Sequence, residues 1–272
     1  MASERVVLHV VDEGAGRPVL LLHGFPDSSA LWRHQVPALV DAGFRAITPD
    51  LRGFGRSPRP ERVEDYAMPG VVGDLLALLD DLGVEQADVV GHDWGSAVGW
   101  VLAATAPERV RSLVAVSVGH PGVRRHLGVE QREKSWYMLL FQFPEAEQLL
   151  AAEDWKLFRQ LLRDDGDRDS YLKDLSRPGA LTAALNWYRA NLAPRLQLAP
   201  PPPLPPVTVP VLGIWSTGDH YLVEDHVRLS ERFVSGPWRY ERIEGASHWV
   251  PLDAPDRLNR LLVDFLSADV EA

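Results

Sequence analysis

The stretch Gly91-His92-Asp93-Trp94-Gly95 carries the strongest indication of fold and chemistry in this chain. It follows a strand pattern over 87–90, and it precedes a helical pattern over 96–105. Two glycines that flank a central residue between a strand and a helix are the pattern of a nucleophile elbow, whose tight turn lifts the central side chain above the sheet. The N-terminus of the following helix favours a negative charge at that point. We therefore expect Asp93 to be a nucleophile.

Strand and helix patterns alternate on both sides of this elbow, which indicates an α/β protein. Continuous apolar runs, such as 19–22, are typical of strands buried on both faces of a sheet. The expected strands are 6–11, 19–22, 45–48, 87–90, 110–118, 211–215 and 238–243. The expected helices are 31–40, 71–82, 96–105, 225–234 and 256–266. We predict a mostly parallel central sheet flanked by helices.

A long helical segment interrupts this alternation. Residues 124–198 are rich in charge and large aromatics and show no clear strand pattern. The proline-rich stretch 200–206 permits neither a helix nor a central strand, and it predicts a stiff polyproline-II connector. Strand patterns then resume. We expect a core formed by 1–123 and 207–272, with an inserted helical cap over 124–206.

Composition narrows the function classes further. The chain has 272 residues, 46% of them hydrophobic, no cysteine and a formal net charge of −10. Without cysteine, disulfides, thiol catalysis and thiolate metal sites are excluded. The negative charge argues against nucleic acid and anionic lipid as partners. No basic segment precedes an apolar N-terminal stretch, and no apolar run reaches the ~18 residues needed to cross a bilayer. We expect a cytoplasmic protein without a membrane or nucleic-acid partner.

Three further pieces follow strands of the predicted sheet, as a nucleophile elbow requires. Phe25, in His23-Gly24-Phe25-Pro26, is positioned to donate its backbone N–H to an oxyanion hole, together with the N–H of Trp94. Asp219 follows the expected strand 211–215, and His248 follows the expected strand 238–243. The chain order is then nucleophile, acid, histidine. His23 is interpreted as structural, while His92 and His220 adjoin the candidates without an assigned partner.

An aspartate nucleophile decides the class of reaction. A serine needs a histidine to take its proton, whereas an aspartate with a pKa near 4 is already anionic at pH 7. Such a carboxylate attacks a saturated carbon by displacement and forms an ester with the enzyme. His248 then activates water to hydrolyse the ester, and Asp219 orients His248. Esterase, lipase and peptidase activities are therefore disfavoured.

Displacement at carbon is compatible with two main leaving groups, an epoxide oxygen or a halide. An epoxide oxygen leaves as an alkoxide and needs an acid, for which a phenol is suited. A halide needs only N–H donors. The predicted cap offers both tyrosines and tryptophans, in the stretches Trp136-Tyr137 and Trp187-Tyr188. Composition alone leaves Tyr137 and Tyr188 open to a role as ordinary packing residues.

The motifs together resemble the epoxide hydrolases of the α/β-hydrolase fold, of the soluble type with a helical lid. The matching stretches are His23-Gly24-Phe25-Pro26, Trp32-Arg33-His34-Gln35, Asp50-Leu51-Arg52-Gly53-Phe54-Gly55-Arg56-Ser57, Gly91-His92-Asp93-Trp94-Gly95, Phe141-Gln142-x-Pro144, Asn186-Trp187-Tyr188-Arg189 and Ser247-His248-Trp249. They are spread over nearly the whole chain. The first four are shared with haloalkane dehalogenases or other hydrolases, so the two motifs of the lid are the discriminating ones.

The resemblance implies particular roles in the lid. Tyr137 and Tyr188 occupy the positions of the two family tyrosines, which implies that they bind and protonate the epoxide oxygen. Trp136, Phe141 and Trp187 are expected to contact an apolar epoxide substrate. No cofactor is implied, and the sequence shows no ligand spacing typical of a metal site.

Two alternatives remain open at this point. A haloalkane dehalogenase would use the same Asp93, with Trp94 as one halide donor and Trp136 or Trp187 as a second. A non-catalytic relative that binds a small ligand would have no use for an intact Asp93, Asp219 and His248. The sequence is also compatible with a homodimer.

Overall fold

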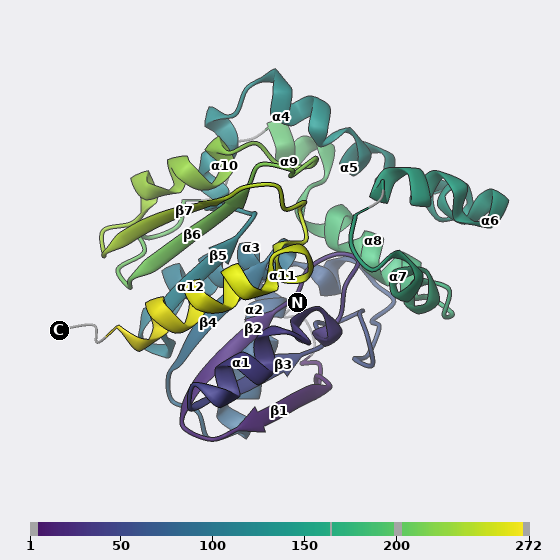
Figure 1. Cartoon of the computed structure of the whole chain (residues 1–272). Helices are drawn as coiled ribbons and strands as arrows, with labels where there is room; N and C mark the ends of the chain where they lie inside the picture. The colour runs from purple at the N-terminus through teal and green to yellow at the C-terminus, as the bar shows by residue number, and fades with distance from the viewer. Residues whose placement is uncertain (1–4, 164, 199–202, 269–272) are drawn as a thin grey trace.

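The computed structural model describes residues 5–163, 165–198 and 203–268 (Figure 1). Its centre is a seven-stranded sheet in the order β1-β3-β2-β4-β5-β6-β7. The strands are β1 (Val10–Gly14), β2 (Arg17–Leu22), β3 (Phe44–Pro49), β4 (Ala87–His92), β5 (Val110–Val116), β6 (Val211–Ser216) and β7 (Trp238–Ile243). Only β1 runs antiparallel to its neighbour, and the other pairings are parallel. The predicted α/β architecture with a mostly parallel sheet is confirmed.

Helices cover both faces of the sheet. In Figure 1, α1 (Gln35–Asp41) and α12 (Pro255–Ser267) lie in front of the strands, while α2 (Met68–Asp81) and α3 (Trp94–Thr105) lie behind them. The short helices α10 (Asp225–Arg228) and α11 (Val250–Asp253) follow β6 and β7. The 3-10 helices are η1 (Ser29–Trp32), η2 (Val63–Tyr66), η3 (Pro107–Arg109), η4 (Pro121–His126) and η5 (Leu229–Phe233). The strands β2, β4 and β6 are almost entirely buried, as their apolar sequences predict.

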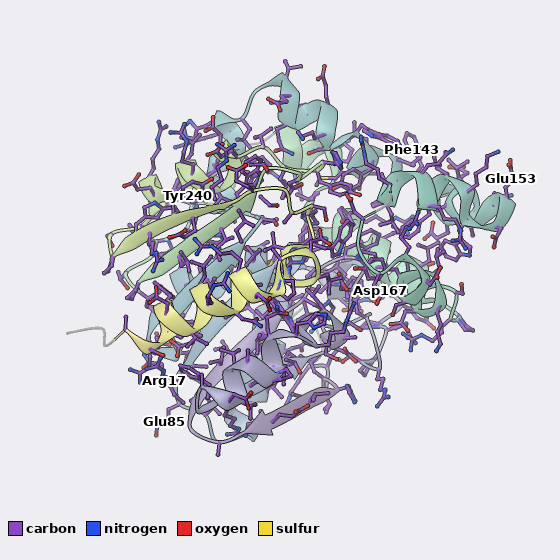
Figure 2. The ribbon with its side chains drawn as sticks, viewed as in Figure 1. Arg17, Glu85, Phe143, Glu153, Asp167 and Tyr240 are labelled. Carbon is purple, nitrogen blue, oxygen red and sulfur yellow. The ribbon has the colours of Figure 1, made fainter. Side chains whose placement is uncertain are left out.

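A group of helices stands between β5 and β6 and lies over the upper right of the sheet in Figure 1. We call it the helical insertion, and its helices are α4 (Val129–Lys134), α5 (Trp136–Leu140), α6 (Ala146–Leu162), α7 (Arg168–Leu175), α8 (Ala180–Asn191) and α9 (Pro194–Leu198). Its outer end carries Phe143 and Glu153 (Figure 2). The predicted proline connector 200–206 falls partly outside the described residues. The described chain resumes at residue 203 and reaches the sheet through a bridge between Val207 and Val234.

Several predicted elements differ from the observed ones. The strand expected at 6–11 begins only at Val10, because the N–H of Val6 donates to Asp74 on α2 and takes this part of the chain away from the sheet. The helix expected at 31–40 is broken into η1 and α1. Pro37 explains the break, since proline fits the first turn of α1 but would clash inside a continuous helix.

The helix expected at 225–234 is also shorter. It becomes the 3-10 helix η5 after Arg228. Ser230 donates its hydroxyl to the carbonyl of His226 and accepts the N–H of His120, and such local side-chain bonds compete with regular helix. None of the described helices is long and apolar enough to span a membrane.

A buried ion pair connects α2 to the loop after β3. Arg52 donates to the carboxylate of Asp74 at 2.6 Å, and both side chains are almost fully buried. The other oxygen of Asp74 accepts the N–H of Val6, while the carbonyl of Arg52 accepts the indole N–H of Trp187 at 3.0 Å. One buried pair therefore fixes the N-terminal segment and a contact to the helical insertion.

Removal of the Asp74 carboxylate should destabilise the protein strongly. The substitution Asp74→Ala removes the buried carboxylate that opposes the Arg52 charge, so we expect a loss of about 3–5 kcal/mol in the free energy of unfolding. The control is Asp80→Ala, which removes the exposed partner of Arg109 and should cost less than ~1 kcal/mol. Urea unfolding measures both. Equal losses for the two variants would contradict this interpretation.

Candidate active site

Asp93 lies at a sharp turn between β4 and α3. Its backbone has φ 53° and ψ −119°, a conformation that L residues rarely adopt. Glycine is required on both sides, because a Cβ on Gly91 would overlap the backbone of Gly95, and a Cβ on Gly95 would overlap the carbonyl of Leu22. The elbow thus projects the Asp93 side chain from the carboxyl end of a central strand, as the sequence pattern predicts.

His248 lies between two carboxylates. Its Nδ1 is 2.8 Å from Oδ2 of Asp219, and its Nε2 is 3.5 Å from Oδ2 of Asp93. The other oxygen of Asp219 accepts the backbone N–H groups of Tyr221 at 2.8 Å and Leu222 at 2.9 Å. Asp219 is therefore held by three donors, and the imidazole is held by Asp219. The structure brings the three predicted triad residues together.

The charges of this group support one another. Burial lowers the pKa of His248. The charge of Asp219 and the hydrogen bonds to both aspartates raise the pKa by more, so that it is about 10. Burial raises the pKa of Asp93, but the hydrogen bond and the charge of His248 lower it by more, so the pKa falls below its usual value. At neutral pH the site therefore contains an imidazolium and an ionised Asp93.

The predicted oxyanion donors lie beside Asp93. The N–H of Phe25 donates to Oδ1 of Asp93 at 2.8 Å. Trp94 is the first residue of α3, where backbone N–H groups have no partner within the helix. Gly24 makes the close approach possible, because a Cβ there would overlap Asp93 and lie 2.7 Å from the nitrogen of Trp94.

Two tyrosines of the helical insertion complete a small cavity with Asp93 and His248. Tyr137, on α5, and Tyr188, on α8, are both buried, and their ring centroids are 6.2 Å apart. Burial and the nearby charge of Asp93 raise the pKa of both phenols well above the usual value, so both are protonated. The cavity measures about 20 Å³. Its lining residues are Phe25, Pro26, Asp93, Tyr137, Leu161, Leu162, Tyr188, Tyr221, His248 and Trp249.

Comparisons with known proteins identify the family of this chain. Residues 17–154 match the family model described as alpha/beta hydrolase fold. The AB hydrolase superfamily protein YfhM of Bacillus subtilis is 36% identical, over 96% of this chain and 94% of its own. Epoxide hydrolase A of Mycobacterium tuberculosis is 34% identical, again over 96% of this chain and 94% of its own. The crystal structure of Bacillus megaterium epoxide hydrolase in complex with an inhibitor superimposes with a TM-score of 0.87 at 29% identity, covering 96% of this chain and 97% of that one.

This chain belongs to the α/β-hydrolase superfamily, among its epoxide hydrolases. The resemblance drawn from the motifs is thereby confirmed, and so is the fold class that it implied. Among the described residues of this hydrolase, no group of three or more His, Asp and Glu side chains could hold a metal ion.

The three predicted substrate contacts do not line the cavity of this hydrolase. Trp136 is 50% exposed, because its neighbour Tyr137 points inward and successive residues of a helix point about 100° apart. Phe141 is fully buried behind the two phenols, with ring centroids 5.4 Å from Tyr137 and 4.9 Å from Tyr188. Trp187 donates its indole N–H to the carbonyl of Arg52 and so joins α8 to the core.

The histidines next to the candidates have structural contacts. His23 donates from Nδ1 to the carbonyl of Gly24 and accepts the N–H of Leu51 at Nε2. These bonds hold the loop that carries Phe25, in keeping with the structural role expected for His23. His92 donates from Nε2 to the carbonyl of His248 at 2.9 Å. Burial lowers the pKa of His92 to about 4, so it stays neutral beside the imidazolium.

Sequence reasoning missed Tyr221, which lines the cavity between Tyr137 and His248. Its ring centroid is 5.9 Å from that of Tyr137 and 5.2 Å from that of His248. Its hydroxyl donates to the carbonyl of Leu161 on α6 at 2.9 Å, so this third phenol connects the loop that carries Asp219 to the helical insertion. Its position two residues after Asp219 was the available signal.

A buried carboxyl, Asp27, was also missed. It follows the oxyanion loop and accepts the indole N–H of Trp249 at 2.9 Å. Burial raises the pKa of Asp27 to about 7, against the opposing effect of that hydrogen bond. The folded pKa lies above the unfolded value near 4, so the folded state binds this proton more tightly. The stability from this group is complete below pH ~4 and is lost as pH rises toward 7.

The substitution Asp27→Asn should remove this pH dependence, because the amide keeps an acceptor for Trp249 without a charge. We expect the variant to exceed the wild type in unfolding free energy by up to about 4 kcal/mol at pH 8, and the difference to shrink toward pH 4. Urea unfolding at several pH values measures it, with the exposed Asp41→Asn as control. A difference that is constant with pH would refute the assignment.

Proposed function

We propose that this chain hydrolyses epoxides to vicinal diols through a covalent ester on Asp93. The observation that carries the proposal is one buried cavity lined by a carboxylate nucleophile, a histidine and two protonated phenols. The family membership supports the same activity, since relatives and solved structures of similar length bear the name epoxide hydrolase.

In the first step, an oxygen of Asp93 attacks a ring carbon, and the carbon–oxygen bond of the epoxide breaks. Tyr137 and Tyr188 bind the epoxide oxygen, and one of them gives its proton to the alkoxide that forms. The raised pKa keeps both phenols protonated at rest, and the alkoxide is basic enough to take a proton from one of them. The esterification of Asp93 also removes a negative charge that raises the pKa of both phenols, so they become stronger acids as the alkoxide appears.

In the second step, water hydrolyses the ester. Once Asp93 is an ester, one of the two carboxylates that raise the pKa of His248 has lost its charge. The proton of His248 then returns to the phenolate, which restores the phenol, and the neutral imidazole takes a proton from water. The hydroxide attacks the carbonyl carbon, and the N–H groups of Phe25 and Trp94 stabilise the oxyanion. On collapse the leaving alkoxide takes the proton of the hydroxyl that was added to the carbonyl carbon, so the diol is released, Asp93 is again a carboxylate and His248 remains an imidazolium.

The substrate is proposed to be neutral and apolar, since aromatic and aliphatic side chains form most of the cavity wall. A volume of about 20 Å³ holds about one water molecule, so entry of an epoxide requires the wall to move. We assign this movement to the helical insertion. In this proposal residues 124–206 form a cap, and residues 1–123 and 207–272 form the core. The protein is proposed to act in the cytoplasm.

The contacts of the tryptophans disfavour a haloalkane dehalogenase. The indole N–H of Trp187 is bonded to a backbone carbonyl, and Trp136 is half exposed, so neither offers the second halide donor that the sequence allowed. Two buried phenols beside Asp93 suit an oxygen leaving group instead.

The substitution His248→Gln should trap the ester, because attack by Asp93 does not require the imidazole, whereas hydrolysis does. Mixed with styrene oxide or another epoxide that the wild type turns over, the variant should gain the mass of one epoxide, and peptide mapping should place it on Asp93. The control Asp93→Asn should gain nothing. Intact-mass spectra of His248→Gln without an adduct would overturn the two-step mechanism.

The combined substitutions Tyr137→Phe and Tyr188→Phe should abolish ring opening. Loss of general acid catalysis costs about 10²–10⁴-fold in rate, so we expect diol release to fall by at least about 10²-fold. The control is Tyr221→Phe, which alters a phenol of the same cavity whose hydroxyl is bonded to Leu161. It should retain activity within about threefold. Equal losses in the double variant and the control would contradict the assignment of the acids.

A further inference from the structure

Among the described residues, β7 forms an open edge of the sheet, since β6 is the one strand that pairs with it there (Figure 1). The carbonyl of Pro237 accepts the N–H of Val211 on β6 at 2.8 Å, and the carbonyl of Ile243 accepts the N–H of Thr217, directly after β6, at 3.0 Å. Because backbone groups of successive residues in a strand point to opposite sides, the N–H and C=O groups of Trp238, Tyr240 and Arg242 point away from the sheet. Within the described chain, no hydrogen bond satisfies these outward groups. Such an edge can pair with another strand.

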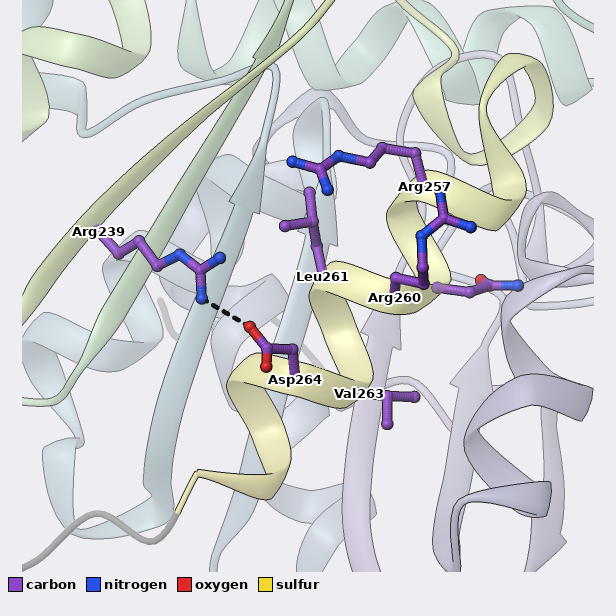
Figure 3. A pocket seen from close by; sticks show the side chains of 7 residues that line it. Arg239, Arg257, Arg260, Leu261, Val263 and Asp264 are labelled. Atoms are coloured by element: carbon purple, nitrogen blue, oxygen red, sulfur yellow. Dashed lines mark hydrogen bonds and ion pairs between the residues drawn. The ribbon is translucent and has the colours of Figure 1, made fainter.

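The side chains of β7 divide into two rows. Arg239 and Glu241 face α12. Arg239 donates to Asp264 at 2.9 Å (Figure 3), and Glu241 accepts from Arg257 at 3.1 Å. Arg239 borders a surface hollow of about 570 Å³, which is lined by Arg239, Arg257, Asn259, Arg260, Leu261, Val263 and Asp264. On the other face, Tyr240 donates its hydroxyl to Glu224 at 3.0 Å. Figure 2 shows Tyr240 at this edge of the molecule.

We propose that two copies of this chain pair antiparallel through β7, about a two-fold axis at Tyr240. In an antiparallel pair, hydrogen-bonded positions must join residues whose backbone groups both point outward. An axis at Tyr240 meets this requirement, because Tyr240 faces the partner's Tyr240 and Trp238 faces the partner's Arg242. The backbone alone also permits an axis at Arg239 or at Glu241.

The charges select among these registers. With the axis at Tyr240, Arg239 stands opposite the partner's Glu241 on the α12 face, at a position where paired side chains approach most closely. An axis at Arg239 would oppose two arginines, and an axis at Glu241 would oppose two glutamates, and like charges directly opposite are destabilising. Charged side chains normally protect an edge strand from pairing. On β7 they permit the register centred at Tyr240 and disfavour the registers centred at Arg239 and at Glu241.

The second face agrees with the same register. Trp238 and the partner's Arg242 would be cross-strand neighbours, an arrangement suited to a cation–π contact, and Arg242 already lies 5.9 Å from the ring of Trp215. An interface built on one strand pair is small, so we expect a dissociation constant on the order of micromolar.

Charge reversal tests the register directly. Sedimentation equilibrium from about 1 to 100 μM should show a monomer–dimer equilibrium for the wild type. Arg239→Glu places an acid opposite the partner's Glu241, and Glu241→Arg places a base opposite the partner's Arg239. Each variant alone should dissociate with a constant at least about tenfold higher. A 1:1 mixture of the two variants should dimerise again, because every opposed pair then has opposite charges.

The control Arg132→Glu makes the same change of charge on exposed α4 and should dimerise like the wild type. Diol release should be unchanged in all variants, since β7 contributes no residue to the catalytic cavity. A monomeric wild type at 100 μM would overturn the proposal. So would single reversals that dimerise normally, or a mixture that stays monomeric.

Discussion

The imidazole of His248 lies between two buried carboxylates, and the rest of the site depends on this arrangement. Three ionisable groups in a region of low dielectric are costly unless each is paired. Asp219 is paired by two backbone N–H groups and the imidazole, and Asp93 by the N–H of Phe25 and the imidazole. The result is a raised pKa for His248 and a lowered one for Asp93, so the resting nucleophile is charged.

The same arrangement explains why the two tyrosines suit their proposed role. Negative charge on Asp93 keeps both buried phenols protonated, and its loss on ester formation acts on the phenols and on the histidine at once. One change of charge therefore favours both proton transfers that the reaction needs. The fold supplies the geometry, because Asp93, Asp219 and His248 follow β4, β6 and β7 at the carboxyl edge of the sheet, and the helical insertion brings the phenols to them.

Local pattern was enough to predict much of this. Gly91 and Gly95 flank the elbow at positions where a Cβ would overlap the backbone, so the elbow could be predicted from the sequence. β7 was predicted with its observed bounds because its alternating run is short and clearly ended. The break before Pro37 was missed because apolar spacing continued across it.

Contacts between distant segments were not predictable from pattern. Tyr221 enters the cavity because the loop that carries Asp219 contacts α6. Asp27 is buried because Trp249 and the helical insertion cover it. Trp136 was expected at the substrate because aromatic content does not say which of two adjacent helical residues faces inward. The structure places Tyr137 inside and leaves Trp136 half exposed.

A single turnover in ¹⁸O-labelled water, with enzyme in excess over an epoxide, tests the central role of Asp93 most directly. In the two-step mechanism water attacks the ester carbonyl, so the label should appear in the peptide that carries Asp93 and be absent from the first diol released. A labelled diol from that first turnover, with an unlabelled Asp93, would mean that water attacks the epoxide itself and would contradict the account.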